Sequence, residues 1–349
     1  MQVGDKMKKK IAYLLTIMIV VAAVGAAFSY AFGSAGRTVV SGDGEEFQIV
    51  TSFYPIYVIA ENLVEGIEDV QVRNLTENQS GCLHDYQLTT KDMKLLEQAD
   101  VLLLNGAGME SFLEGALSEL NHLAVISSEE GIELLELMSE HDHGGHEEAN
   151  KLGEAVHEVE EDHNHEVADS HEGHDHGDHN AHVWLDPARY RQQVINLAEG
   201  LIKEDPVHEK QYAANRDVYL TKIDQVVTEY QDAFVELSEQ PVIIFHDAFA
   251  YYEEVLPLHV VMAVEVEGDE SALSAGEMAE VLEEIKLHGI QYLFIEEQYT
   301  QTVADVLAQE SGTQTVVLDS LVTGDGDADS WLMGMDRNLE ILKDIFLEN

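Results

Sequence analysis

Asn180-Ala181-His182-Val183-Trp184-Leu185-Asp186-Pro187 marks the point at which a polar segment ends and a packed segment begins. The polar segment, residues 141–182, holds most of the chain's 17 histidines, interleaved with Asp, Glu and Gly and with few aliphatic residues. Such a composition cannot form a hydrophobic core, so we expect a solvated loop over residues 141–181. Imidazole and carboxylate groups bind borderline divalent ions such as zinc, which indicates a loop that collects metal. An expression tag, the alternative explanation, would be uniform and terminal, and this run is neither.

Length and composition set broad limits on the function. The chain has 349 residues, of which 45% are hydrophobic, enough for a large core and about two domains. Its formal charge of -50 comes from 68 acidic and 18 basic residues, which argues against a nucleic-acid partner because phosphate binding needs the opposite sign. Cys82 is the only cysteine, so an internal disulfide and a CxxC metal motif are both excluded, and we expect a buried, inert thiol.

The N-terminal region has the order of an export signal. Lys6, Lys8, Lys9 and Lys10 precede an apolar run over residues 11–32. This run approaches the roughly 20 residues that span a bilayer, so a cleaved signal and an uncleaved membrane anchor both remain open for residues 1–46. Either interpretation places the rest of the chain outside the cytoplasm. No cysteine lies near Gly33 to carry a lipid.

After this region, short apolar or β-branched runs alternate with helical patterns, first before the His-rich loop and again after it. This alternation predicts an α/β fold with two lobes, each built on a parallel sheet with both faces covered. The expected strands are residues 48–51, 70–75, 101–104 and 123–126 in the first lobe and residues 242–245, 259–264, 292–295 and 315–318 in the second, with helices over residues 56–63, 90–98 and 187–203.

A long helix is expected between the two lobes. Asp205-Pro206 offers a cap and a first-turn proline, and an apolar stripe at helical spacing then continues until Pro241. A helix over residues 207–237 would be about 45 Å long, longer than one small lobe needs, so we interpret it as a rigid strut. The alternative is an ordinary helix packed on a single domain. The expected organisation is an N-terminal lobe over residues 47–204, a linking helix over residues 205–238 and a C-terminal lobe over residues 239–349.

Four residues are candidate metal ligands. His246 and Asp319 each follow an expected strand directly, at the edge where open α/β sheets bind ligands. His84 lies in the loop after strand 70–75, and His182 lies in the connection that leaves the first lobe. Three imidazoles and one carboxylate suit tetrahedral zinc better than manganese, which prefers oxygen. Taken singly, each has a simpler explanation, since a lone histidine after a strand is usually a surface residue and an aspartate beside a serine is usually a turn residue.

Several motifs in order resemble one protein family, the zinc and manganese substrate-binding proteins of bacterial ABC importers (the ZnuA type, or cluster A-I). The resemblance covers the chain from about Phe47 to the C-terminus, with the His-rich loop as the variable part. The motifs that carry it are Thr51-Ser52-Phe53-Tyr54-Pro55-Ile56, His84-Asp85-Tyr86, Gly106-x-Gly108-x-Glu110, His182-Val183-Trp184-Leu185-Asp186-Pro187, Phe245-His246-Asp247-Ala248-Phe249 and Leu318-Asp319.

The resemblance implies two Rossmann-like lobes joined by a rigid helix, with one metal ion in the cleft between them. It places the ligands on His84, His182, His246 and Asp319, with Asp319 or a water molecule completing the set. Relatives that resemble manganese carriers have a carboxylate where this chain has His246, and an acidic His-rich loop is typical of the zinc branch. The implied function is that of an extracytoplasmic carrier. It binds Zn(II) as its cargo and passes it to a membrane permease without any chemistry on the ion, as a monomer and not as an enzyme.

Three other functions stay open at this point. The first is a component of a manganese importer. The second is an adhesin or metal buffer that works without a transporter. A zinc hydrolase, the third, needs an open coordination position and a general base, and no HExxH motif or similar arrangement singles one out.

Overall fold

The computed structural model describes residues 46–77, 83, 86–137, 179–264, 273–296 and 301–347. The expected signal or anchor, Cys82, His84 and most of the His-rich loop lie outside these ranges. Residues 46–349 form one compact unit. Within the described ranges, none of the helices combines the length and apolarity needed to cross a membrane.

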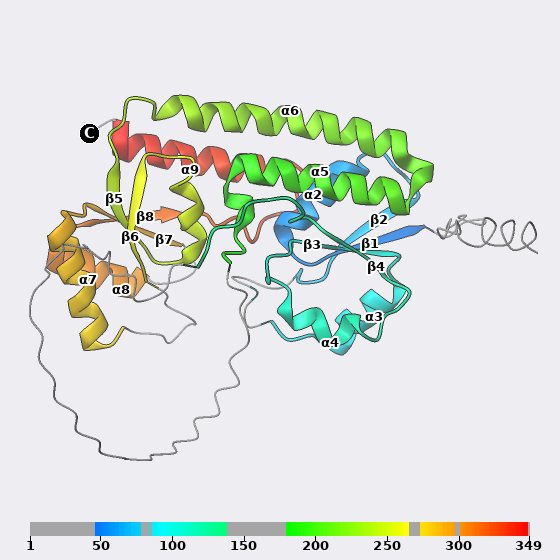
Figure 1. The fold of residues 1–349 in the computed structure, drawn as a ribbon, viewed down its shortest axis with the longest axis horizontal. Coiled ribbons are helices and arrows are strands. Elements are labelled where there is room, and N and C mark those ends of the chain that lie inside the picture. Colours follow the sequence, from blue (N-terminus) through cyan, green and yellow to red (C-terminus); the bar gives the residue numbers. More distant parts are fainter. Residues whose placement is uncertain are drawn as a thin grey trace, which may run out of the picture. The chain divides into compact units, whose positions relative to one another are not determined.

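The described part of the chain contains two four-stranded sheets, and all their strand pairs are parallel (Figure 1). The prediction of two parallel-sheet α/β lobes is therefore confirmed. The first sheet has the order β2-β1-β3-β4 and the second the equivalent order β6-β5-β7-β8. The strands are β1 (Phe47–Thr51), β2 (Val70–Asn74), β3 (Val101–Leu104), β4 (Ala124–Ser127), β5 (Gln240–Ile244), β6 (Leu258–Ala263), β7 (Tyr292–Glu296) and β8 (Gln314–Leu318).

Both faces of the first sheet are buried, which explains why its strands are apolar at consecutive positions. Ile49 packs into the core that contains α2 (Tyr54–Val64) and α5 (Pro187–Glu204). The next residue, Val50, packs on the opposite face against α3 (Thr90–Gln98) and the short helix η2 (Ser111–Leu113), which leads into α4 (Glu114–Leu117). Strand side chains alternate between faces, so each sheet needs helices on both sides.

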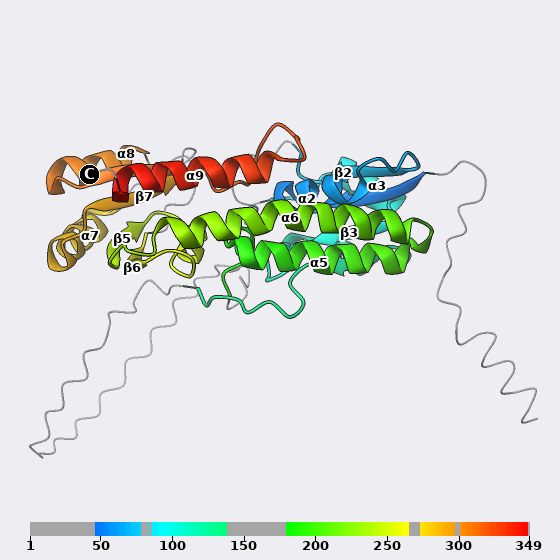
Figure 2. The same cartoon turned by 90° about the horizontal axis from the view of Figure 1, so that it is seen from above.

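The two lobes share one hydrophobic core. The cluster that includes Ile49 of β1 also includes Ile244 of β5 and Phe294 of β7. Two long helices, α6 (Glu209–Ala233) and α9 (Ser330–Leu347), contribute to it (Figures 1 and 2). The other face of the second sheet packs against α7 (Ala275–His288) and α8 (Gln301–Ser311) in a separate cluster.

Helix α6 contacts α2 and α5 along one part of its length and α9 along another (Figure 2). It is shorter than the sequence predicts, because residues 206–208 form a 3-10 turn before it and the helix ends at Ala233. The prediction that the Asp205 side chain caps the helix is wrong. Its carboxylate accepts hydrogen bonds from the His208 ring at 2.6 Å and from the Tyr212 hydroxyl at 2.8 Å instead of from the helix backbone.

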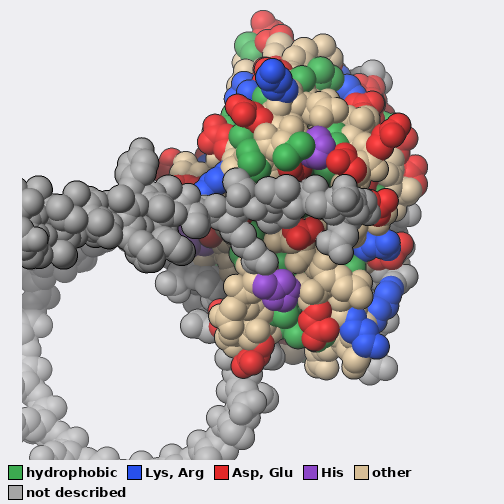
Figure 3. All heavy atoms as spheres, turned by 90° about the vertical axis from the view of Figure 1, so that its right-hand side faces the viewer, with side chains coloured by type: hydrophobic (Ala, Val, Ile, Leu, Met, Phe, Trp, Pro, Cys, Tyr) green, Lys and Arg blue, Asp and Glu red, His purple; other side chains and the backbone are tan. Residues whose placement is uncertain are grey.

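Charged side chains are dispersed over the surface. On the face drawn in Figure 3, acidic side chains are scattered among uncharged ones, and basic side chains lie between them in a few places. The described acidic residues are therefore not gathered over a single element on this face.

Candidate metal centre

Two adjacent strands of the second sheet bring polar side chains to the same edge. β5 and β7 are hydrogen-bonded neighbours, and β5 lies between β6 and β7, where the strand order reverses. His246 follows β5 after one intervening residue, and Glu296 is the last residue of β7. Open α/β sheets bind ligands at this switch point, so the position of His246 agrees with the sequence argument.

His182 is held at the start of a short turn that leads into α5. The turn η3 (Val183–Leu185) is completely buried, and Asp186 then caps α5 by accepting hydrogen bonds from the amides of Ala188 at 2.7 Å and Arg189 at 3.2 Å. Trp184 anchors the turn, because its indole N–H donates to the Ser320 carbonyl at 2.8 Å. The backbone around His182 is therefore fixed from several sides.

The structure brings His182 and His246 together. Their ring centroids are 4.6 Å apart and the rings meet edge to face at 80°. His182 is only 2% exposed. Two imidazoles from different lobes at this separation are the arrangement expected of a shared ion, since zinc binds imidazole nitrogen at about 2.0–2.1 Å.

Each imidazole has a buried polar partner at Nδ1 that the sequence argument missed. The Asn180 Oδ1 atom lies 2.9 Å from His182 Nδ1, and the Glu296 Oε1 atom lies 2.5 Å from His246 Nδ1. Asn180 is fully buried and Glu296 is 3% exposed. The signal for Glu296 was available, because it directly follows the strand expected over residues 292–295, at the same sheet edge as His246. The signal for Asn180 was weaker, namely a short polar residue two positions before a candidate ligand.

The other two predicted ligands are not tested by this arrangement. His84 lies outside the described residues. Asp319 directly follows β8 as expected, and its carboxylate accepts from the Leu321 amide at 2.8 Å and pairs with Arg337 at 3.0 Å. Across the described ranges, no three His, Cys, Asp or Glu side chains are grouped so that they could hold a metal ion. Of the three predicted ligands that the structure describes, it brings His182 and His246 together.

The ends of the His-rich segment lie close to this pair. Glu136 and His179 form an isolated antiparallel bridge, and the Asn180 amide donates to the Leu135 carbonyl at 2.7 Å. Residues 138–178 lie outside the described ranges; the described residues on either side of them are paired with each other, and His179 lies three positions before His182.

A buried carboxylate supports the backbone next to the site. Glu110 accepts hydrogen bonds from the Ser52 hydroxyl at 2.7 Å and from the amides of Asn105 at 2.7 Å and Gly106 at 3.0 Å. Asn105 in turn donates to the Ala181 carbonyl at 2.9 Å, immediately before His182. Burial raises the pKa of Glu110 to about 7 despite these three donors.

This pKa predicts a pH-dependent stability. The folded-state pKa lies above the unfolded value, so the contribution of Glu110 is complete below about pH 4.5 and is lost as the pH rises through about 7. The loss corresponds to about 3 kcal/mol. We expect the Glu110→Gln variant, which cannot ionise, to lose less stability than the wild type between pH 5 and pH 8 in chelator-containing denaturant titrations. Parallel pH profiles for the two proteins would contradict the assignment.

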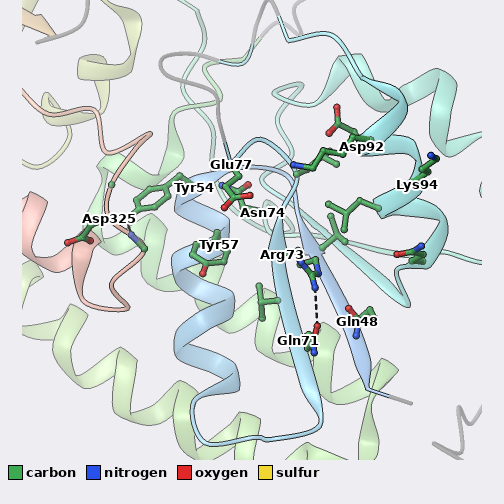
Figure 4. A pocket seen from close by; sticks show the side chains of 18 residues that line it. Gln48, Tyr54, Tyr57, Gln71, Arg73, Asn74, Glu77, Asp92, Lys94 and Asp325 are labelled. Carbon is green, nitrogen blue, oxygen red and sulfur yellow. Dashed lines mark hydrogen bonds between the residues drawn. The ribbon is translucent and has the colours of Figure 1, made fainter. Parts of the chain in front are cut away.

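A separate cavity of about 950 Å³ lies at the edge strand β2 and contains no histidine among its described lining residues (Figure 4). Tyr54 and Tyr57 line it from α2, Gln71 and Arg73 from β2, and Lys94 from α3. Its lining mixes aromatic, amide, basic and acidic groups, the last being Glu77, Asp92 and Asp325, and it is separate from the imidazole pair that marks the candidate metal site.

Comparison with known proteins agrees with the fold. The model of a family described as "Zinc-uptake complex component A periplasmic" (ZnuA) matches residues 49–345. A zinc-binding protein AdcA of Streptococcus pyogenes serotype M3 is 29% identical over 316 residues, which are 90% of this chain and 56% of the relative. The chain thus spans about half the length of that relative.

Two further comparisons extend the match. The high-affinity zinc uptake system protein ZnuA of Bacillus subtilis is 27% identical over 310 residues, covering 87% of this chain and 89% of the relative. The crystal structure of Zn(II)-bound AdcA from Streptococcus pneumoniae superposes with a TM-score of 0.66 at 22% identity, covering 86% of this chain and 57% of that one. This likeness supports the two-lobed fold.

Proposed function

This chain belongs to the ZnuA family of zinc-uptake components, and from that premise we propose that it captures Zn(II) outside the cytoplasm and delivers it to the permease of an ABC importer. The ion is cargo and undergoes no chemistry, so the proposed protein is a carrier and not an enzyme. His182 and His246 bind the ion from the two lobes in this proposal, and His84 and Asp319 complete the set.

The observation that carries the proposal is the pair of imidazoles. Their ring centroids lie 4.6 Å apart, and each ring has an oxygen partner at Nδ1. Neutral imidazole is a good ligand for zinc and a poorer one for manganese, which prefers oxygen. A nitrogen-rich pair therefore favours zinc as the cargo over manganese.

The His-rich segment has a second part in the proposal. It binds zinc weakly at several places and raises the local concentration of the ion near the cleft, as a tether does in an intramolecular transfer. The bridge between Glu136 and His179 supports this, because it pairs the described residues that flank the segment, and His179 is three positions from His182.

We expect the full chain to bind several zinc ions, one of them tightly. A variant in which a short Gly-Ser linker replaces residues 142–176 should lose the weak sites and keep the tight one. Zinc titration against a competing chelator, followed by metal analysis, measures both properties. The absence of a tight site in the wild type would refute the proposed function, and its loss only in the deletion variant would move the primary site from the cleft to the segment.

A further inference from the structure

Asn180 connects the two lobes through its side chain. Its Nδ2 atom donates to the Asp247 carbonyl at 2.8 Å, and Asp247 follows His246 in the second lobe. Its Oδ1 atom accepts from the His182 amide at 3.0 Å and lies 2.9 Å from His182 Nδ1. One buried amide therefore touches the backbone beside one imidazole and the ring of the other.

These contacts determine which way the amide faces. A backbone carbonyl can only accept a hydrogen bond, so the amino end of Asn180 must face Asp247. The oxygen end then faces His182 and can only accept. The proton of the neutral His182 ring must consequently lie on Nδ1, which leaves the lone pair on Nε2.

Glu296 has the same effect on the second imidazole. A carboxylate can only accept, and Glu296 Oε1 lies 2.5 Å from His246 Nδ1. The Glu296 side chain is 3% exposed, so water competes little for this contact. The His246 proton is therefore also held on Nδ1, and its lone pair is also on Nε2.

We propose that Asn180 and Glu296 are positioning residues that fix both imidazoles in the tautomer that binds metal through Nε2. Because the orientation of Asn180 is set by the Asp247 carbonyl, the tautomer of the first-lobe ligand depends on a backbone group of the second lobe. The inference rests on the proposed zinc site and adds how the two lobes prepare it. Such partners of ligating histidines typically contribute about 10–100-fold in metal affinity.

The two partners differ in charge, which predicts unequal effects. Glu296 offers a charged acceptor and Asn180 a neutral one, and charge-assisted hydrogen bonds are roughly twice as strong as neutral ones. Replacing Glu296 should therefore weaken zinc binding more than replacing Asn180.

The test compares Asn180→Leu and Glu296→Leu with a matched control in the full chain. The control is Asn62→Leu, which removes another buried amide whose Nδ2 donates to Val58 and Ala328 carbonyls and which has no part in the proposed site. We expect zinc dissociation constants about 10-fold higher for Asn180→Leu, about 100-fold higher for Glu296→Leu and nearly unchanged for Asn62→Leu, measured against a competing chelator. Thermal melts of the metal-free proteins correct for any loss of stability.

Conservative variants separate a positioning role from a packing role. Glu296→Gln keeps an oxygen acceptor without the charge and should restore part of the affinity lost in Glu296→Leu. In nitrogen-15 NMR of the metal-free protein, the His182 ring should carry its proton on Nδ1 in the wild type and shift toward the Nε2-protonated tautomer in Asn180→Leu.

Three outcomes have different meanings. If the wild type binds zinc tightly and both leucine variants bind it equally well, the positioning roles are wrong while the proposed function stands. If the wild type has no tight site, the proposed function itself fails. An unchanged His182 tautomer in Asn180→Leu would overturn the role of Asn180 whatever the affinity.

Discussion

The His246→Asp variant should bind zinc at least about 100-fold more weakly than the wild type. Structural zinc sites contribute about 10–16 kcal/mol, so one of the four proposed ligands would account for about 3 kcal/mol, or about two powers of ten. The new carboxylate would also lie beside the buried Glu296, which replaces a favourable contact with a repulsive one.

The same variant should shift selectivity toward manganese, because a carboxylate ligand suits that ion better than imidazole does. Competition titrations with both metals measure the shift. The double variant His246→Asp, Glu296→Gln is the matched control, since it removes the repulsion and should bind manganese better than the single variant. Zinc affinity and selectivity equal to those of the wild type would rule out His246 as a ligand.

The Trp184→Ala variant should lose about 4 kcal/mol of unfolding free energy in the absence of metal. Trp184 is completely buried, and truncating such a residue costs about 3–5 kcal/mol through lost contacts and the cavity left behind. The change also removes the indole donor to the Ser320 carbonyl, a contact between segments of the two lobes.

Denaturant unfolding in the presence of chelator measures this loss. Trp184→Phe serves as the control, because it keeps an aromatic ring and gives up the N–H donor, so we expect a smaller cost of about 1–3 kcal/mol. A loss in Trp184→Ala below about 1 kcal/mol would mean that the turn is held mainly by other contacts.

Much of the fold could be predicted because local signals and tertiary packing agree. α3 spans the predicted residues 90–98, since Thr89 and Asp92 form a capping box that fixes its start. The end of α6 was placed too late for a physical reason. Phe234 lies beyond the helix but is buried and packs edge to face on Phe346. The apolar side chain at this position therefore indicated burial, and it did not indicate helical backbone.

The candidate site was only partly predictable. Both His246 and Glu296 come directly after expected strands, but histidine is a distinctive ligand type, whereas Glu296 is one of 68 acidic residues and was therefore not singled out. The role of Asn180 depends on the Asp247 carbonyl, 67 positions away, and no local pattern contains that contact. The positions of His84 and Asp319 in the site stay predictions.

The placement of the two tryptophans has a practical consequence. Trp184 and Trp331 are the only tryptophans in the chain, both are buried in the core shared by the lobes, and the Trp331 indole N–H donates to the Trp184 carbonyl. The ring of Trp184 lies 5.2 Å from that of His182. All indole fluorescence of the protein therefore originates where the lobes meet, so the intrinsic emission would serve as a label-free optical reporter of zinc binding at the proposed ligand His182.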